Sequence, residues 1–430
     1  MLMTDIIEKK RDKHPLDDKE LEFFVSGVTD KSIPDYQISA LLMAILLNGM
    51  DRRETLTLTT LMAKSGDMLD LSDLSHTADK HSTGGVGDKT TLAVAPIAAA
   101  LGCTVAKMSG RGLGFTGGTV DKLESITGYK TALDTAEFKK IAREHGMCVT
   151  GQSGNFAPAD KRLYAIRDVT ATVNSIPLIA SSIMSKKLAA GAETIVLDVK
   201  FGSGAFMKTA EDAEILAREM VEIGKGAGRK TAAVITDMDV PLGYAVGNAL
   251  EVKEAVRVLK GEGEKNLTSL CILLAAKMYQ ISFDKTEEES IAAARRVTAD
   301  GIAFKRLCAA VKAQGGNEKL LTGEHKFPAA AQIELTAEKD GYITAMNSET
   351  VGKAAVMTGA GRERLGDSID YSAGIILSKK YGDYVQKGER LATLYGAPER
   401  LQNARERLAD AYSIGESKPS DKPIVYKVID

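Results

Sequence analysis

Residues that build metal centres and disulfides are scarce in this 430-residue sequence, which has only four cysteines and five histidines. None of the cysteines stands in a CxxC or Cys/His spacing, so the pattern favours neither a zinc site nor a disulfide framework. We interpret the cysteines as buried thiols. They are Cys103, Cys148, Cys271 and Cys308.

A strong charge of one sign and a long apolar run are also missing. The 56 basic and 58 acidic residues leave a net charge of −2, which gives no electrostatic reason to expect nucleic acid or an anionic membrane as a partner. The longest run of AVILMFWYC residues, 40–47, is far shorter than the roughly 20 residues of a membrane-spanning helix. The segment MLMTDIIEKKRDKH places charges where a secretory signal is apolar. We therefore expect a cytoplasmic protein that binds a small molecule.

The length predicts two or three domains. Residues 1–66 contain helix signals and no strand signal; Asp51 with Glu54 three positions later is typical of a helix N-terminus. In residues 67–158, short apolar runs alternate with helical segments, which predicts βα units on a mainly parallel sheet. The predicted fold class is therefore α/β, with a small helical domain beside a large α/β domain.

The rest of the chain extends both domains and adds a third unit. Residues 159–193 again have a helical pattern, and we expect them to pack back onto the N-terminal helices. Strand-like runs return in residues 194–330, which continue the α/β domain. Residues 331–430 consist of short alternating segments, typical of a C-terminal β-rich α+β unit.

Two glycine-rich loops point to an anion site. The first, KHSTGGVGDKT at 80–90, fails as a P-loop because Asp88 stands where that motif needs glycine. The second contains GxGxxG at 112–117, but the acidic residue about 20 positions on, Glu137, lies in a predicted helix, where a dinucleotide fold needs a strand end. Each loop follows a strand-like run and precedes a helix, so both are expected at one edge of the sheet, enclosing a phosphate. The alternative is that these glycines only make tight turns.

The second loop also belongs to a longer signature. SGRGLGFTGGTVDKLE at 109–124, preceded by KHSTGGVGD and followed by RDVTATVNSIPLIASSIMSKKLA, resembles the thymidine and pyrimidine-nucleoside phosphorylases. The resemblance extends over essentially the whole chain. It implies reversible phosphorolysis, in which inorganic phosphate displaces a pyrimidine base from a nucleoside and leaves the (deoxy)ribose 1-phosphate. It also implies a homodimer formed through the helical domain, and a cleft that closes over the substrates, with hinges near 66–80, 155–160 and 191–196.

The resemblance assigns roles to individual residues. The implied phosphate ligands are Lys80, Ser82, Thr91, Lys107, Ser109 and Thr119. The implied base-binding residues are Tyr164, Arg167, Ser182, Lys186 and Phe206. Arg167 and Lys186 would act in catalysis on the base carbonyls. His81 is a candidate proton donor to the base, and two alternatives stay open for it: it orients the sugar or fills a turn.

A potassium ion is implied near the first loop. The matching positions are Gly87, Lys89, Leu242, Ala245 and Glu254. Lys89 departs from the family, because the members compared have threonine there, so a hydroxyl ligand is lost. The site survives if that position coordinates through its backbone carbonyl. Lys107 favours the branch that accepts uridine as well as thymidine and deoxyuridine, and a thymidine-only enzyme is the alternative.

Two further functions are possible alternatives for this sequence. An anthranilate-type phosphoribosyltransferase has similar glycine loops but needs a magnesium–pyrophosphate site, and no acidic pair near the loops suits that ion. The C-terminal unit resembles a biotinyl or lipoyl carrier domain, but the modified lysine of such carriers is replaced by Asn347. We therefore expect this unit to be structural.

Overall fold

The computed structural model describes residues 1–430 except 113, 153, 324–328 and 365. The N-terminal helices are α1 (Met3–Arg11), α2 (Asp18–Thr29), α3 (Asp35–Asn48) and α4 (Arg52–Lys64). Helix α4 begins as predicted, because Asp51 accepts a hydrogen bond from the Glu54 amide and the Glu54 carboxylate accepts one from the Asp51 amide. None of the helices in the described part of the chain is long and apolar enough to cross a membrane.

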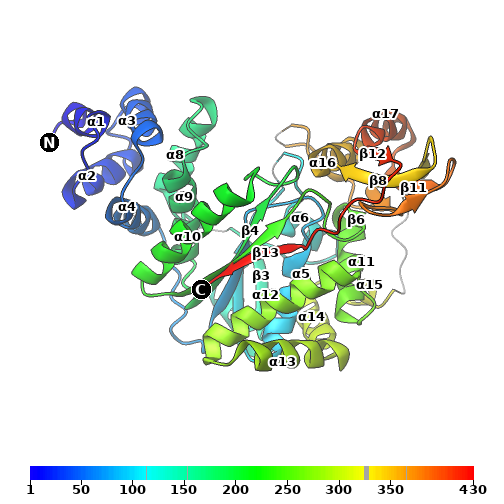
Figure 1. Cartoon of the computed structure of the whole chain (residues 1–430). Coiled ribbons are helices and arrows are strands. Elements are labelled where there is room, and N and C mark those ends of the chain that lie inside the picture. The colour runs from blue at the N-terminus through cyan, green and yellow to red at the C-terminus, as the bar shows by residue number, and fades with distance from the viewer. Residues whose placement is uncertain (113, 153, 324–328, 365) are drawn as a thin grey trace.

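Two later helices, α8 (Pro158–Val169) and α9 (Ile176–Ala189), pack against α2, α3 and α4. Leu163 and Ile166 of α8 and Leu178 of α9 belong to the same buried hydrophobic cluster as Leu21 and Leu41. The helical part is therefore assembled from two separated segments, and Figure 1 shows it as one group of helices beside the sheet.

A mainly parallel sheet forms the centre of the molecule. Strands β1 (Ala78–Ser82), β4 (Thr194–Phe201) and β5 (Lys230–Asp237) are parallel, and β13 (Val425–Ile429) pairs antiparallel with β5. A second parallel pair, β2 (Val105–Ser109) and β3 (Met147–Gly151), is joined to β1 through the bridge between Thr77 and Thr104. The end of the chain thus leaves the predicted C-terminal unit and completes the central sheet.

Helices cover both faces of this sheet. Ile195, Leu197 and Val199 of β4 pack with α9 and α10, whereas Val196 packs with α5 and α12 on the other face. A strand buried on both faces carries consecutive apolar residues, which explains the run IVL at 195–197. The remaining helices of the α/β part are α5 (Thr90–Ala100), α6 (Thr119–Glu124), α7 (Thr135–His145), α10 (Ala210–Gly226), α11 (Asn248–Leu259), α12 (Lys265–Phe283), α13 (Glu287–Ala299), α14 (Ile302–Ala313) and α15 (Lys319–Thr322).

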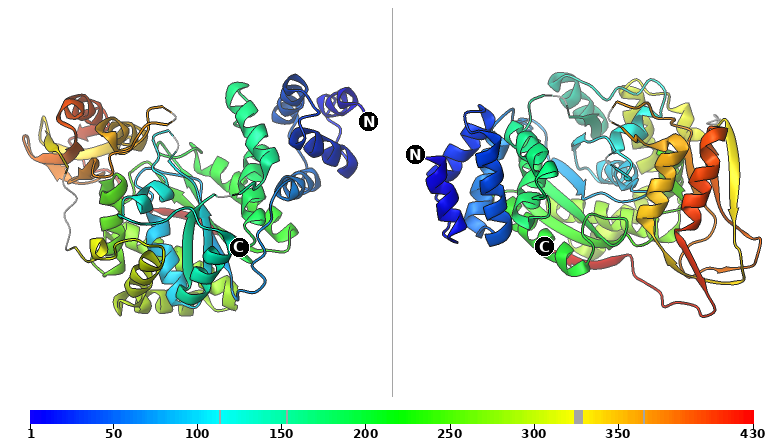
Figure 2. Two further views of the ribbon diagram at one scale, coloured as in Figure 1. Left: turned by 180° about the vertical axis from the view of Figure 1, so that it is seen from behind. Right: turned by 90° about the horizontal axis from the view of Figure 1, so that it is seen from above.

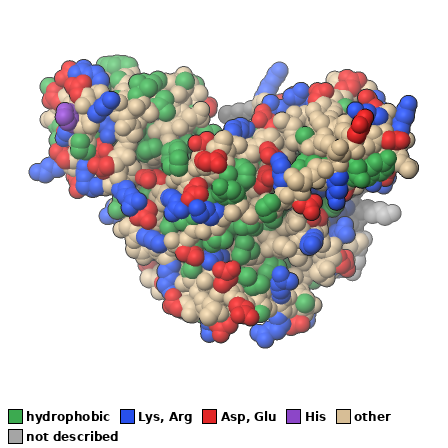
Figure 3. All heavy atoms as spheres, viewed as in Figure 1, with side chains coloured by type: hydrophobic (Ala, Val, Ile, Leu, Met, Phe, Trp, Pro, Cys, Tyr) green, Lys and Arg blue, Asp and Glu red, His purple; other side chains and the backbone are tan. Residues whose placement is uncertain are grey.

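In its described residues, the C-terminal unit contains two small antiparallel sheets and two α-helices. Its elements are β7 (Ala331–Thr336), β8 (Gly341–Met346), α16 (Ser348–Ala355), η1 (Val356–Ala360), β9 (Gly374–Leu377), β10 (Tyr384–Val385), β11 (Arg390–Gly396), α17 (Pro398–Ala409) and β12 (Tyr412–Gly415). The short strand β6 (Ala245–Val246) of the α/β part pairs with β9 and joins the two units. Figure 2 shows this unit and the N-terminal helices at opposite ends of the molecule, and Figure 3 shows the surface hollowed between them.

The cysteines are free thiols, as expected from their spacing. Three are buried, and Cys308 is half-buried. Burial raises the pKa of Cys103 and of Cys271 to about 12, so neither ionises near neutral pH.

Candidate active site

The two glycine loops meet at the carboxyl ends of β1 and β2. The ammonium of Lys107 on β2 donates to the carbonyl oxygen of Lys80 on β1 across 2.5 Å. Ser82 and Ser109 end these two strands, and both are partly exposed. Helices α5 and α6 follow the loops and bring in the remaining two predicted phosphate ligands, Thr91 and Thr119, each in a first turn. The strand, loop and helix order predicted for both loops is therefore present.

Lys80 is buried and surrounded by oxygen atoms. Its ammonium donates to the hydroxyl of Thr90 across 2.5 Å and lies 3.1 Å from Asp198 Oδ2. Asp88 Oδ1 is 4.0 Å away. Burial favours the neutral amine, but the two carboxylates outweigh it and raise the pKa of Lys80 above its ordinary value. Lys80 is therefore a fixed positive charge beneath the loop.

Asp79, next to Lys80, binds two more lysines. Its Oδ1 lies 3.0 Å from the ammonium of Lys107, and its Oδ2 lies 2.9 Å from that of Lys187. Burial favours the neutral carboxyl, but both cations hold the pKa of Asp79 well below its usual range. Burial, together with the charges of Lys187 and Lys80, lowers the pKa of Lys107 to about 8 despite the adjacent Asp79. With Lys200, whose ammonium lies 3.0 Å from Asp198 Oδ2, four lysines are gathered with Asp79, Asp88 and Asp198 at the strand ends. This excess of positive charge suits an anion.

His81 faces the same cations. Burial first, and then the charges of Lys187 and Lys107, lowers its pKa well below the ordinary value. The imidazole is therefore neutral near pH 7, and it can donate one N–H but has no extra proton to release. This environment favours an orienting role over proton donation.

The predicted base-binding side chains lie in pairs on α8 and α9. The guanidinium carbon of Arg167 is 5.9 Å from the centre of the Tyr164 ring. Lys186 donates to the Ser182 hydroxyl across 3.2 Å and to Asp160 Oδ2 across 2.6 Å. Both predicted helix-face pairings are thus present.

Arg167 is held by main-chain oxygens. Its three nitrogens donate to the carbonyls of Thr172, Val173 and Leu178 across 2.7 to 3.3 Å, and burial lowers the pKa of the guanidinium. A guanidinium has five N–H groups, so these bonds leave two that donate to none of these carbonyls, and 2% of the surface of Arg167 is exposed. Phe206 lies in the turn after β4 with 42% of its surface exposed, where a ligand can reach it.

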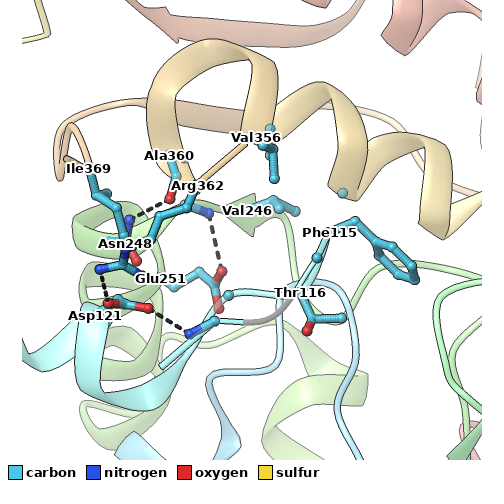
Figure 4. A pocket seen from close by; sticks show the side chains of 17 residues that line it. Phe115, Thr116, Asp121, Val246, Asn248, Glu251, Val356, Ala360, Arg362 and Ile369 are labelled. Carbon is cyan, nitrogen blue, oxygen red and sulfur yellow. Dashed lines mark hydrogen bonds and ion pairs between the residues drawn. The ribbon is translucent and has the colours of Figure 1, made fainter. Parts of the chain in front are cut away.

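The second glycine loop is fixed from the C-terminal unit. Arg362 lies 2.9 Å from Asp121 Oδ1, and Oδ2 of the same carboxylate accepts the Gly112 amide across 2.7 Å (Figure 4). Nearby, Asn248 donates to the carbonyl of Ala360 across 2.8 Å. A Cβ on Gly118 would lie 2.1 Å from the Gly112 nitrogen, so the loop requires glycine there. Asp121 and Arg362 thus shape the loop that precedes Thr119.

The residues predicted to bind potassium are also brought together, but their centre is filled. Lys89 is completely buried, and its ammonium donates to the carbonyl of Leu242 across 2.7 Å, to that of Ala245 across 2.8 Å and to Glu254 Oε2 across 2.6 Å. Gly87 is adjacent, since a Cβ on it would lie 2.6 Å from the Leu242 oxygen. These residues do not fit a potassium ion in this chain, because an ammonium already binds three of the expected ligands.

Sequence reasoning missed the charged partners of the site. They are Asp79, Asp88, Asp160, Lys187, Asp198 and Arg362. Asp79 directly precedes Lys80 of the first loop, and Lys187 directly follows Lys186. Their places beside predicted site residues were the only indication in the sequence that they belong to the site. Asn347 is a helix cap, since its side chain accepts the Thr350 amide of α16 across 2.8 Å. The C-terminal unit is therefore not built as a carrier domain at this position.

Comparison with known proteins agrees with this arrangement. Residues 4–66 match the helical bundle domain of a glycosyl transferase family, residues 74–304 match its a/b domain, and residues 342–415 match the pyrimidine nucleoside phosphorylase C-terminal domain. Pyrimidine-nucleoside phosphorylases of Staphylococcus epidermidis and Staphylococcus aureus are 50% and 51% identical to the chain over 435 and 432 positions, with complete coverage of both sequences.

A solved structure shows the same fold. The anthranilate phosphoribosyltransferase of Thermus thermophilus superposes with a TM-score of 0.58 at 20% identity, over 72% of this chain and 98% of its own. At this identity the likeness concerns the fold alone. The transferase alternative therefore has less support than phosphorolysis, which the full-length relatives favour. The three matched domains and the relatives half identical over the whole length show that the chain belongs to the pyrimidine-nucleoside phosphorylase family.

Proposed function

We propose that this protein cleaves pyrimidine nucleosides with inorganic phosphate, in the reaction that names its relatives. A phosphate oxygen bonds to C1′ of the sugar as the bond from C1′ to the base nitrogen breaks. The electron pair of that bond leaves with the base, which takes up a proton, and the sugar leaves as its 1-phosphate. The nucleophile is a substrate, so the protein has to position two molecules and stabilise charge.

One observation supports this function most directly. Lys187 of α9 binds Asp79 on the phosphate side, and the residue before it, Lys186, is a predicted base ligand. Consecutive residues of one helix therefore connect the two half-sites. Such a helix can hold the phosphate and the base at a fixed separation, which the attack on C1′ requires.

The cations divide the work between attack and departure. Lys80 and Lys107, with the hydroxyls of Ser82, Thr91, Ser109 and Thr119, would bind the phosphate oxygens. Arg167 and Lys186 would donate to the base carbonyls, where negative charge develops as the glycosidic bond breaks. The N–H groups of Arg167 and Lys186 that do not donate to protein oxygens would donate to the base carbonyls.

The substrate range follows from Lys107, which supports acceptance of uridine, deoxyuridine and thymidine. The test is incubation of the purified protein with each nucleoside, with and without phosphate, followed by chromatography of the free base. Phosphate-dependent release from uridine and thymidine is expected. Release from thymidine alone would contradict the broad range, and release without phosphate would contradict phosphorolysis.

A homodimer through the helical part is part of the proposal. Only one face of the apolar run 40–47 is used inside the molecule, because Leu41, Leu42 and Ile45 are buried while Met43 and Leu47 are exposed. An exposed apolar helix face of this kind suits a subunit contact. Light scattering after size exclusion should give twice the 45.9 kDa chain mass, and one chain mass would contradict it.

Closure of the cleft and a cytoplasmic location stay predictions. Solution scattering with and without phosphate plus a base analogue tests the closure, and identical curves would contradict it.

A further inference from the structure

The ammonium of Lys89 forms a complete coordination sphere inside the protein. It has three N–H donors, and each has an oxygen partner: two carbonyls and the carboxylate of Glu254. The partners come from the loop that contains Leu242, from Ala245 at the start of β6 and from helix α11. A buried lysine with three charge-assisted or carbonyl hydrogen bonds is held in one geometry.

The charge of this site is balanced without a metal ion. The carboxylate of Glu254 accepts hydrogen bonds from the Lys89 ammonium and from the backbone amides of Tyr244 and Ala245 across 2.6 to 2.9 Å, a set of donors that suits a carboxylate. One ammonium and one carboxylate leave no net charge. A potassium ion at the same oxygens would have to displace the ammonium or lie against it, and like charges at that distance in a buried site repel strongly.

We propose that the Lys89 ammonium is a built-in cation that takes the place of the potassium ion implied by the resemblance, so that this chain needs no added monovalent cation. Potassium and ammonium ions carry the same charge and are similar in size, and both bind carbonyl and carboxylate oxygens. The lysine supplies that charge covalently, and its binding does not depend on the ion concentration.

The position of Lys89 shows what the charge holds in place. Lys89 directly precedes α5, whose first two residues are Thr90, bonded to Lys80, and Thr91, a predicted phosphate ligand. Its backbone amide also donates to the Gly87 carbonyl across 2.9 Å, which tightens the glycine loop. Lys89 is therefore a positioning residue, which fixes the phosphate loop against the loop of residues 242–245.

The wild-type protein gives the first test. Its melting temperature and its KM for phosphate are measured in potassium chloride and in choline chloride at an equal ionic strength of about 0.1 M. Both values should be unchanged. A rise in melting temperature with potassium, or a several-fold lower KM for phosphate, would overturn the proposal. The melting temperature reports on the cation site even if the nucleoside reaction itself proved to be different.

Two variants separate a charge requirement from a packing requirement. Lys89→Thr removes the ammonium but leaves oxygen ligands and space, so its melting temperature should fall by roughly 5 to 10 °C in choline and recover with potassium. Lys89→Met is the matched control, because it fills the space without charge and should lose as much with no recovery. Recovery of both variants, or of neither, would overturn the proposal.

A crystal of Lys89→Thr soaked in rubidium chloride gives a readout independent of stability. Anomalous scattering should locate one rubidium ion between Leu242, Ala245 and Glu254 in the variant and none there in the wild type. Rubidium at those oxygens in the wild type would overturn the proposal.

Discussion

Lys187 on α9 and Asp79 on β1 form a buried ion pair, with 2.9 Å between the ammonium and Oδ2. The two residues are 108 positions apart in the chain. Through this contact the helical part is bound directly to the strand that begins the phosphate loop. It is therefore a natural place to test how the two half-sites are held together.

Lys187→Met should weaken both folding and phosphate binding. The change leaves the buried Asp79 with one cation instead of two, so the free energy of unfolding should fall by roughly 3 kcal/mol, and the KM for phosphate should rise.

The neighbouring residue, Lys186, gives the matched comparison. Lys186→Met should lower kcat by a factor of about 100 or more, with a smaller loss of stability, because Lys186 is partly exposed and would act on charge that develops late. Urea denaturation measures the free energy of unfolding, and initial rates measure kcat and the KM for phosphate. Equal changes in stability, kcat and KM in the two variants would contradict separate roles for Lys187 and Lys186.

Phosphate binding should weaken as the pH rises through about 8. The pKa of Lys107 is lowered to about 8, so this lysine loses its charge there, whereas the pKa of Lys80 is raised and Lys80 stays charged. KM for phosphate should therefore rise between pH 7.5 and 9, and Lys107→Arg should shift the rise to higher pH because a guanidinium stays charged. A KM that stays constant up to pH 9.5 would contradict this.

The lowered pKa of Lys107 also determines in which direction its contribution to the free energy of unfolding changes with pH. Between about pH 8 and the ordinary lysine range, the unfolded chain binds a proton at Lys107 that the folded chain does not. The contribution of Lys107 to the free energy of unfolding should therefore increase with pH in this window. Chemical denaturation at several pH values should show a steeper fall of stability with pH for Lys107→Arg than for the wild type.

The turnover rate should not depend on a protonated His81. Its lowered pKa keeps the imidazole neutral, so kcat should be constant between pH 6.5 and 8. If His81 supplied the proton as an imidazolium, kcat would fall as the pH rises through its pKa. His81→Asn keeps an N–H donor and should retain more activity than His81→Leu; equal losses would argue against a hydrogen-bonding role.

Arg362→Met should disturb the second glycine loop from a distance. Asp121 then loses one of its cations, and the loop that precedes Thr119 loses its tie to the C-terminal unit. The free energy of unfolding should fall by about 1 to 2 kcal/mol, and the KM for phosphate should rise. Arg400→Met removes an exposed ion pair of the same unit and should leave both nearly unchanged. Equal effects of the two changes would contradict a role for Arg362 in the loop.

Local features of this protein were determined by its sequence. Asp51 and Glu54 define the start of α4, the strand and helix order around both glycine loops follows from hydrophobic period and glycine, and the helix-face pairs Tyr164 with Arg167 and Ser182 with Lys186 follow from helical spacing. These features depend on residues a few positions apart. The interactions that form them are short-range, so the sequence pattern is enough to predict them.

Features that depend on distant residues were decided by the tertiary structure. The resemblance to the family implied one site for Lys89 and Glu254, which are 165 positions apart, but left open what Lys89 does there. The fold brings the Lys89 ammonium onto the oxygens expected to bind an ion. In the same way it brings Lys187 onto Asp79 and the last strand, β13, onto the central sheet. Whether a lysine is a solvated charge, a ligand or a substitute for a metal depends on which oxygens surround it after folding, and that is fixed by packing between elements far apart in the chain.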